Sequence, residues 1–274
     1  MEIKVFNNNV EKALKVAKKK LAGEGLFREL KRRRYYEKPS VRKKAKEREA
    51  QRRRQKWLAK RRPAIRTVKR EIARWPDPVV GVVARQSGRD PFLVLISCLL
   101  SLRTKDKTTA EASERLFALA STPATMQTLT IPVIERAIYP VGFYRTKAKQ
   151  IQQICAQLRE RYQGRVPDKI DELLTLPGVG RKTANLVVTV GYEKPGICVD
   201  IHVHRISNRW GYVKTKSPDE TETALREKLP RKYWITFNDL LVPYGQHLCQ
   251  PVSPLCSQCK IAAYCDRVGV TKSR

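Results

Sequence analysis

The 274-residue sequence predicts an all-α protein. Stretches rich in leucine and alanine carry apolar residues at helical spacing, whereas the alternating pattern typical of strands is scarce. The dipeptides Asn-Gly and Asp-Gly, which favour hairpin turns between strands, are absent. Prolines fall where helices should begin or end, at Pro123, Pro132, Pro167, Pro218 and Pro230.

Residues 1–62 form a basic extension with 24 Lys and Arg against 7 Asp and Glu. A helical pattern spans residues 9–22 and stops at a pair of glycines. A second run, residues 41–61, consists of good helix formers with almost nothing apolar to bury, and Pro39 and Pro63 bracket it. A helix that is polar on every side needs a partner. The composition fits either a solvated, disordered tail or an arm that orders on nucleic acid.

The composition becomes that of a globular body from about Pro63 onward. Apolar residues recur at helical spacing in four segments, residues 92–100, 112–120, 147–162 and 182–190. No repeat of the length found in solenoid proteins is present. The body therefore predicts a helical core of its own, separate from the extension.

The net charge of +31 restricts the class of partner. A field of this sign attracts polyanions, with nucleic acid favoured over an acidic membrane surface. No apolar run approaches the roughly 18 residues of a spanning helix, and residues 1–6 lack the pattern of a secretory signal. We expect no membrane partner and a cytoplasmic protein, where clustered cysteines are more often metal ligands than disulfides.

The segment 176–184 reads Leu-Pro-Gly-Val-Gly-Arg-Lys-Thr-Ala. Gly178 and Gly180 allow a tight turn between helices, and the following helix N-terminus presents free amides to an anion such as a DNA phosphate. A plain interhelical turn is the alternative, but Arg181 and Lys182 in so basic a chain favour phosphate binding. Lys182 is also a candidate nucleophile, because an amine can attack a carbonyl-like carbon to form a Schiff base.

Asp200 lies 18 residues after Lys182, in the segment Val-Asp-Ile-His-Val-His-Arg-Ile. An aspartate before a helix is most often its N-cap. The same carboxylate can stabilise a cationic sugar or assist proton transfer at the lysine. His202 and His204 are not expected to bind zinc, since no cysteine lies nearby at ligand spacing and Asp200 is the one acidic neighbour.

Four cysteines crowd the C-terminal end at the spacing C-x6-C-x2-C-x5-C, namely Cys249, Cys256, Cys259 and Cys265. Four thiolates can hold a structural zinc ion, yet zinc ribbons usually show two Cys-x2-Cys pairs and this chain has one. An iron–sulfur cube also accepts four single thiolates from a compact loop. Cys98, Cys155 and Cys198 lie in apolar surroundings and are expected in the core.

These motifs resemble those of the endonuclease III family, the helix–hairpin–helix branch of DNA glycosylases. The resemblance covers about residues 65–267 and rests on the segment 176–184, the Val-Asp-x-His-Val-x-Arg pattern and the cysteine spacing. It implies a two-lobed helical fold with DNA held in the cleft between the lobes. One lobe is expected at residues 63–85 plus 195–274, with the iron–sulfur loop, and the other at residues 86–194.

The resemblance also implies roles for individual residues. Lys182 would be the Schiff-base nucleophile and Asp200 the catalytic carboxylate, and the four C-terminal cysteines would hold a 4Fe–4S cluster with a structural and DNA-docking role. Arg103 stands where many members place glutamine, at the position that enters the duplex after base flipping. Phe143 matches a second wedge, with core packing as its alternative role.

Residues 1–60 resemble a different family, ribosomal protein twenty-one of the bacterial small subunit. The resemblance rests on the opening Met-Glu-Ile-Lys-Val, a helix around residues 11–15 and the segment 29–40, which reads Glu-Leu-Lys-Arg-Arg-Arg-Tyr-Tyr-Glu-Lys-Pro-Ser. It implies contact with small-subunit ribosomal RNA, with Arg32, Arg33 and Arg34 among the contacts.

The sequence thus predicts a bifunctional DNA glycosylase and abasic-site lyase of the bacterial cytoplasm and nucleoid, acting as a monomer on damaged duplex DNA. It would release an oxidised pyrimidine and cleave the strand by β-elimination. One competing interpretation is a ribosome-associated RNA-binding protein that acts through residues 1–60. The other is a mismatch-specific glycosylase without lyase activity, against which Lys182 argues.

Overall fold

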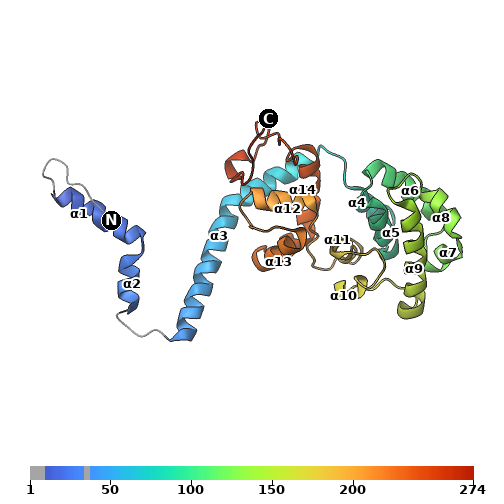
Figure 1. Ribbon diagram of the computed structural model, residues 1–274, viewed down its shortest axis with the longest axis horizontal. Coiled ribbons are helices and arrows are strands. Elements are labelled where there is room, and N and C mark those ends of the chain that lie inside the picture. Colours follow the sequence, from blue (N-terminus) through green and yellow to red (C-terminus); the bar gives the residue numbers. More distant parts are fainter. Residues whose placement is uncertain (1–9, 34–37) are drawn as a thin grey trace. The chain divides into compact units, whose positions relative to one another are not determined.

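The computed structural model describes residues 10–33 and 38–274, without the side chains of residues 31–33, 50, 53–54 and 56–62 (Figure 1). Every regular element in these ranges is helical, which confirms the predicted all-α class. Within the same ranges, no helix combines the length and apolar character needed to cross a bilayer.

The chain divides into two compact units, Met1–Ala59 and Lys60–Arg274. The first contains α1 (Val10–Gly23), α2 (Leu26–Arg33) and most of α3 (Pro39–Ile72). The helices of the second after α3 are α4 (Val79–Gln86), α5 (Pro91–Ser101), α6 (Asp106–Leu119), α7 (Pro123–Thr128), α8 (Ile131–Ile138), α9 (Tyr144–Tyr162), α10 (Ile170–Leu173), α11 (Arg181–Leu186), α12 (Ile201–Arg209), α13 (Pro218–Lys228) and α14 (Trp234–His247).

Helix α3 corrects one expectation. The sequence suggested that Pro63 ends the basic helix, but α3 continues through it for nine more residues. Proline lacks the amide that an interior helical position donates, so it normally ends or kinks a helix. Ala64 and Val68 are 2% and 1% exposed. Burial of this C-terminal part of α3 compensates for the hydrogen bond that the proline removes.

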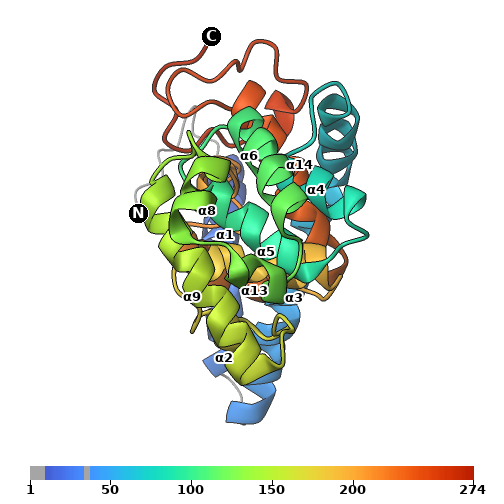
Figure 2. The same ribbon diagram turned by 90° about the vertical axis from the view of Figure 1, so that its right-hand side faces the viewer.

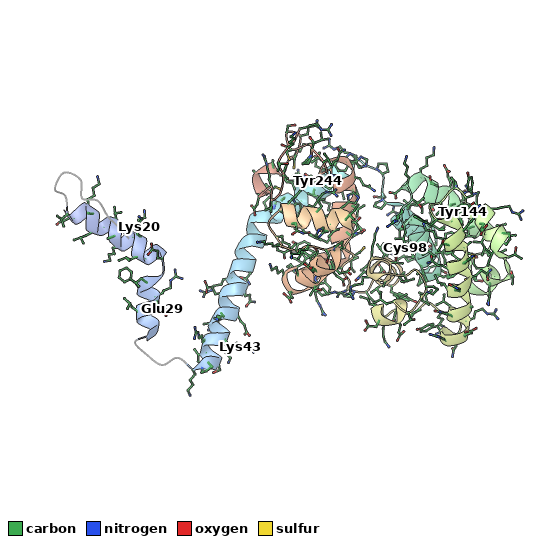
Figure 3. The ribbon with its side chains drawn as sticks, viewed as in Figure 1. Lys20, Glu29, Lys43, Cys98, Tyr144 and Tyr244 are labelled. Carbon is green, nitrogen blue, oxygen red and sulfur yellow. The ribbon has the colours of Figure 1, made fainter. Side chains whose placement is uncertain are left out.

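The main apolar core surrounds α5, which contacts α4, α6 and α9 (Figure 2). Asp90 caps α5 by accepting hydrogen bonds from two backbone amides, and Pro91 occupies its first turn. Cys98 lies on α5, and Figure 3 labels it there. Cys98, Cys155 and Cys198 are all buried, as expected from their apolar surroundings. This core draws its residues from Val79 to Cys198.

Helix α12 packs on α13 and α14, and the C-terminal loop follows α14. The three helices lie together on the side of the second unit away from α7 and α8 (Figure 1). The segment 192–200 crosses from the main core to α12 without regular structure. The lobe boundaries expected from the sequence stay a prediction.

Candidate active site

A tight hairpin between α10 and α11 carries the glycine-containing segment. Gly178 has φ of +77°, and a Cβ there would lie 2.7 Å from the Gln150 side chain. The turn and the close packing of Gln150, on α9, therefore explain why glycine occupies position 178. A Cβ on Gly180 would meet nothing within 4 Å, so the backbone around Gly180 is open on that side. Gly180 precedes α11 and accepts a hydrogen bond from the amide of Ala184.

Lys182 is half-buried in the first turn of α11. No hydrogen bond or ion pair occupies its ammonium group among the described residues, so the amine is available to a substrate. The thiol of Cys198 donates to the Lys182 carbonyl across 3.7 Å. This contact joins the start of α11 to the segment that leads to Asp200.

Asp200 caps the N-terminus of α12, as predicted. Its Oδ1 accepts hydrogen bonds from the amides of His202 and Val203, each at 2.8 Å. The residue is 8% exposed. The carboxylate is therefore fixed in place by the helix that it caps.

Both expected catalytic residues, Lys182 and Asp200, influence the pKa of His202. Burial lowers the pKa of His202, the Asp200 carboxylate acts in the opposite direction, and Arg205 and Lys182 lower it further. Lys182 and Asp200 thus lie within electrostatic range of one ring. Arg205 Nη2 lies 2.9 Å from His202 Nδ1, an arrangement that suits a neutral ring with Nδ1 as acceptor. The sequence alone indicates no role for His202.

Arg181 has a partner that the sequence did not reveal. Its Nε and Nη2 donate to the two carboxylate oxygens of Glu222 at 2.9 and 2.8 Å. Arg226 donates to the same carboxylate at 2.9 Å and to Asn185 Oδ1 at 3.0 Å. The Glu222 side chain is 3% exposed. Arg181 therefore links α11 to α13, and its predicted phosphate contact stays a prediction.

Arg103 and Phe143 lie together at the surface. Phe143 is 62% exposed, so its alternative role in core packing is wrong. The Arg103 guanidinium carbon lies 5.5 Å from the centroid of the Phe143 ring, a cation–π distance. Both residues have left-handed backbone conformations, with φ of +54° and +58°. The structure brings the two predicted wedge residues side by side.

The four C-terminal cysteines line one cavity. The rest of its wall is largely apolar and comes from α14, the end of α12 and the C-terminal loop. Burial raises the pKa of the Cys259 and Cys265 thiols. Among the described residues, no three His, Cys, Asp or Glu side chains converge as ligands of a single ion. Four thiols around a cavity fit the donor set of an iron–sulfur cube.

Polar groups support this cavity. Arg209 Nη1 lies 3.3 Å from Cys249 Sγ, and the Tyr244 hydroxyl lies 3.2 Å from Cys259 Sγ. Arg205 donates to the Cys249 carbonyl from Nε at 3.0 Å. Arg205 and Arg209 lie four residues apart on α12, so one helix face connects the region of His202 to the first cysteine. The sequence analysis did not identify Arg209, although its four-residue spacing from Arg205 could have indicated it.

Two further sequence predictions remain, one on the arginines of the extension and one on His204. The side chains of Arg32 and Arg33, at the end of α2, and the whole of Arg34 lie outside the described residues. His204 Nδ1 lies 2.7 Å from the Thr221 hydroxyl. His204 therefore has a structural partner on α13.

Comparisons with known proteins agree with this geometry. A family model described as HhH-GPD superfamily base excision DNA repair protein matches residues 96–231, and one for Ribosomal protein S21 matches residues 2–55. Endonuclease III of Thermotoga maritima is 49% identical over 177 residues, which are 65% of this chain and 83% of that protein. Endonuclease III-like protein 1 of Bos taurus is 46% identical over 177 residues, which are 64% of this chain and 58% of that protein.

Solved structures give the same result. A trapped endonuclease III–DNA covalent intermediate is 37% identical with a TM-score of 0.62, and the match covers 65% of this chain and 84% of that one. A thermostable thymine-DNA glycosylase is 23% identical with a TM-score of 0.67 over 76% of this chain and 96% of that one, which shows the fold alone. Given the identity and coverage of the Thermotoga maritima protein, this chain belongs to the endonuclease III family of base-excision repair proteins.

Proposed function

We propose that this chain is a DNA glycosylase and abasic-site lyase that removes oxidised pyrimidines from duplex DNA. The observation that carries the proposal is that the hydrogen bond from the Cys198 thiol to the Lys182 carbonyl ties the first turn of α11 to the segment that ends at Asp200, the N-cap of α12. An endonuclease III that is 37% identical to this chain has been trapped as a covalent intermediate with DNA. A covalent route through a lysine is therefore the chemistry that the chain supports best.

In the proposed reaction, the Lys182 amine attacks the sugar C1′ while the bond from C1′ to the damaged base breaks. The base leaves with that electron pair and takes up a proton. The sugar ring opens to give a Schiff base between C1′ and Lys182. Loss of a proton from C2′ then expels the 3′ phosphate, and water hydrolyses the imine to free the lysine. The Asp200 carboxylate stabilises the cationic sugar and assists proton transfer.

The test is borohydride trapping on duplexes that contain thymine glycol or an abasic site. Wild-type protein should give a covalent adduct, and Lys182→Ala should give none because no amine reaches C1′. Lys228→Ala, at an exposed lysine on α13, serves as the control and should trap like wild type. Base release by wild type without any adduct would contradict the lyase proposal and favour a mismatch-specific glycosylase.

We also propose that Cys249, Cys256, Cys259 and Cys265 hold a 4Fe–4S cluster. Their shared cavity and its apolar wall support this assignment. The cluster, when bound, would supply structural cross-linking of the C-terminal loop and no step of the base chemistry. Arg209 would stabilise the negative thiolate of Cys249 through its 3.3 Å contact.

Metal analysis tests the cluster assignment. Protein purified without oxygen should contain iron and inorganic sulfide in about equal amounts, and Cys256→Ser should lower both. The control is Cys155→Ser, a buried cysteine of the main core that should leave the iron content unchanged. Zinc in place of iron would overturn the assignment.

A second function is favoured by the match of residues 2–55 to the Ribosomal protein S21 family. We propose that the extension binds small-subunit ribosomal RNA. Exposed basic residues on α3, including Arg42, Lys43 and Lys44, would neutralise phosphates. Replacing these three by glutamine should weaken binding to a small-subunit RNA fragment and leave borohydride trapping intact. Equal RNA binding by the variant would contradict this proposal.

We propose that the protein acts as a monomer in the bacterial cytoplasm, at the nucleoid. None of the seven cysteines, all of which lie in the described ranges, forms a disulfide, which suits a reducing compartment. Light scattering during gel filtration should give the mass of one chain, and a dimer mass would contradict the monomer.

A further inference from the structure

Lys147 is a buried lysine that no part of the proposed reaction uses. It lies in the first turn of α9, one turn after Phe143, and it is 4% exposed. Its Nζ donates to the carbonyl of Leu100 at 2.9 Å and to that of Leu102 at 2.6 Å. These carbonyls lie at the end of α5, where helical carbonyls lack their own partners. Lys147 therefore satisfies the end of a helix from a neighbouring element.

Burying the charged ammonium group of Lys147 is unfavourable in free energy. Burial lowers the pKa of Lys147 to about 8. An apolar side chain would fill the same space without that cost. The position of the amine, rather than the volume of the side chain, is therefore what this site requires.

A second connection lies beside the first. The amide of Gly142 donates to the Thr104 hydroxyl at 3.1 Å, and Lys147 Nζ lies 3.5 Å from the same hydroxyl. A Cβ on Gly142 would lie 2.7 Å from the Arg103 carbonyl oxygen. The two turns that carry Arg103 and Phe143 are thus in backbone contact, and Lys147 and Thr104 hold them there.

The tips of these turns are strained. Arg103 and Phe143 both have positive φ, a conformation that is unfavourable for a residue with a side chain. Such strain persists only where the surrounding structure enforces it. The hydrogen bonds of Lys147 and Thr104 join the chain segments next to both tips. The result is an exposed arginine and an exposed aromatic ring presented as one unit.

We propose that Lys147 is a positioning residue that holds Arg103 and Phe143 together as a single double wedge. The wedge fills the space left by the flipped nucleotide and displaces the opposite base from the stack. This inference rests on the proposed function for its DNA substrate. Lys147 itself touches no substrate and acts only through the two turns.

The test uses the full chain and a duplex with a stable abasic-site analogue opposite 2-aminopurine, whose fluorescence rises when it leaves the stack. Wild type should raise the fluorescence. Lys147→Met, which keeps the side-chain length but cannot donate, should lose most of this rise. It should also raise KM for trapping on a duplex by about tenfold, equivalent to one broken contact of about 1.4 kcal/mol. Trapping on a single-stranded abasic oligonucleotide needs no wedge and should be unchanged.

A pair of substitutions at Thr104 tests the same connection without removing a buried charge. Thr104→Val removes the hydroxyl and should reproduce the loss of fluorescence, whereas Thr104→Ser keeps the hydroxyl and should behave like wild type. If Lys147→Met does not fold, this pair decides the outcome alone. Lys228→Met, at an exposed position of α13, should match wild type in every assay.

Three results would overturn the inference. The first is a full fluorescence response in Lys147→Met or, if that variant does not fold, in Thr104→Val. The second is a parallel loss of single-stranded and duplex trapping, which indicates a general structural role. The third is wild-type protein without any fluorescence response. A wild type that raises fluorescence but forms no adduct on either substrate would instead contradict the proposed lyase function and leave the wedge intact.

Discussion

The Asp200 carboxylate combines two tasks at one position. Both backbone hydrogen bonds of the α12 cap go to Oδ1, and no hydrogen bond among the described residues engages Oδ2. The first oxygen holds the helix, and the second remains for the reaction. The two tasks should therefore separate on substitution, because asparagine can cap a helix but carries no charge.

Asp200→Asn should fold like wild type and lose activity. Without the negative charge, the cationic sugar and the lysine proton transfer lose their support, so we expect adduct formation to slow by about 100-fold or more. Asp200→Ala should slow it similarly and also lower the free energy of unfolding by about 1 kcal/mol, because the cap is removed. Trapping rates and urea unfolding measure the two effects. An Asp200→Asn variant that traps at the wild-type rate would exclude a catalytic role.

At the scale of elements, Glu222 joins the hairpin helix to α13. It lies buried between Arg181 and Arg226, and Arg226 also reaches Asn185 of α11. Burial alone would raise the pKa of Glu222, but hydrogen bonds from the two arginines outweigh it and hold the pKa below its ordinary value. The position of Lys182 therefore depends on a carboxylate 40 residues away in the sequence.

Glu222→Gln should lower the free energy of unfolding by about 2 kcal/mol at neutral pH, because the variant cannot form charge-assisted hydrogen bonds. The folded-state pKa is lowered, so this stabilisation is full above the ordinary value of 4.5 and disappears as the pH falls through the folded-state pKa. Unfolding of wild type and variant should thus converge in acid. Glu227→Gln, at an exposed glutamate of the same helix, is the control. A difference that persists unchanged in acid would contradict the ionic role.

Local signals in the sequence predicted the all-α class and several helix ends, and they suggested the site residues. The proline in the first turn of α13, the N-cap aspartate of α12 and the positive φ at Gly178 all follow from neighbouring residues. The partners of Arg181 and Lys147 did not follow, because they depend on contacts between residues about 40 positions apart. Pro63 was misjudged for a related reason, since tertiary burial of α3 outweighs the local preference of proline.

At the scale of the whole molecule, charge is unevenly divided along the chain. Residues 1–62 carry 24 Lys and Arg against 7 Asp and Glu, and the remaining residues carry 33 against 19. The excess per residue is therefore much larger in the extension. Because the compact second unit begins at Lys60, the body has a core that does not depend on the extension.

A chain that begins at Lys60 should fold and form the borohydride adduct at the full-length rate once DNA is saturating. Its affinity for nucleic acid should fall less steeply with salt, because each phosphate that the shorter chain no longer neutralises lowers the slope of log K against log salt by about 0.9. Binding of both chains to undamaged duplex and to a small-subunit RNA fragment, measured across salt concentrations, gives the slopes. A larger decrease in affinity for RNA than for DNA is expected, since residues 2–55 match a ribosomal protein family. A truncated chain that folds but cannot trap would instead make the extension part of the repair enzyme, because saturating DNA removes any difference in affinity.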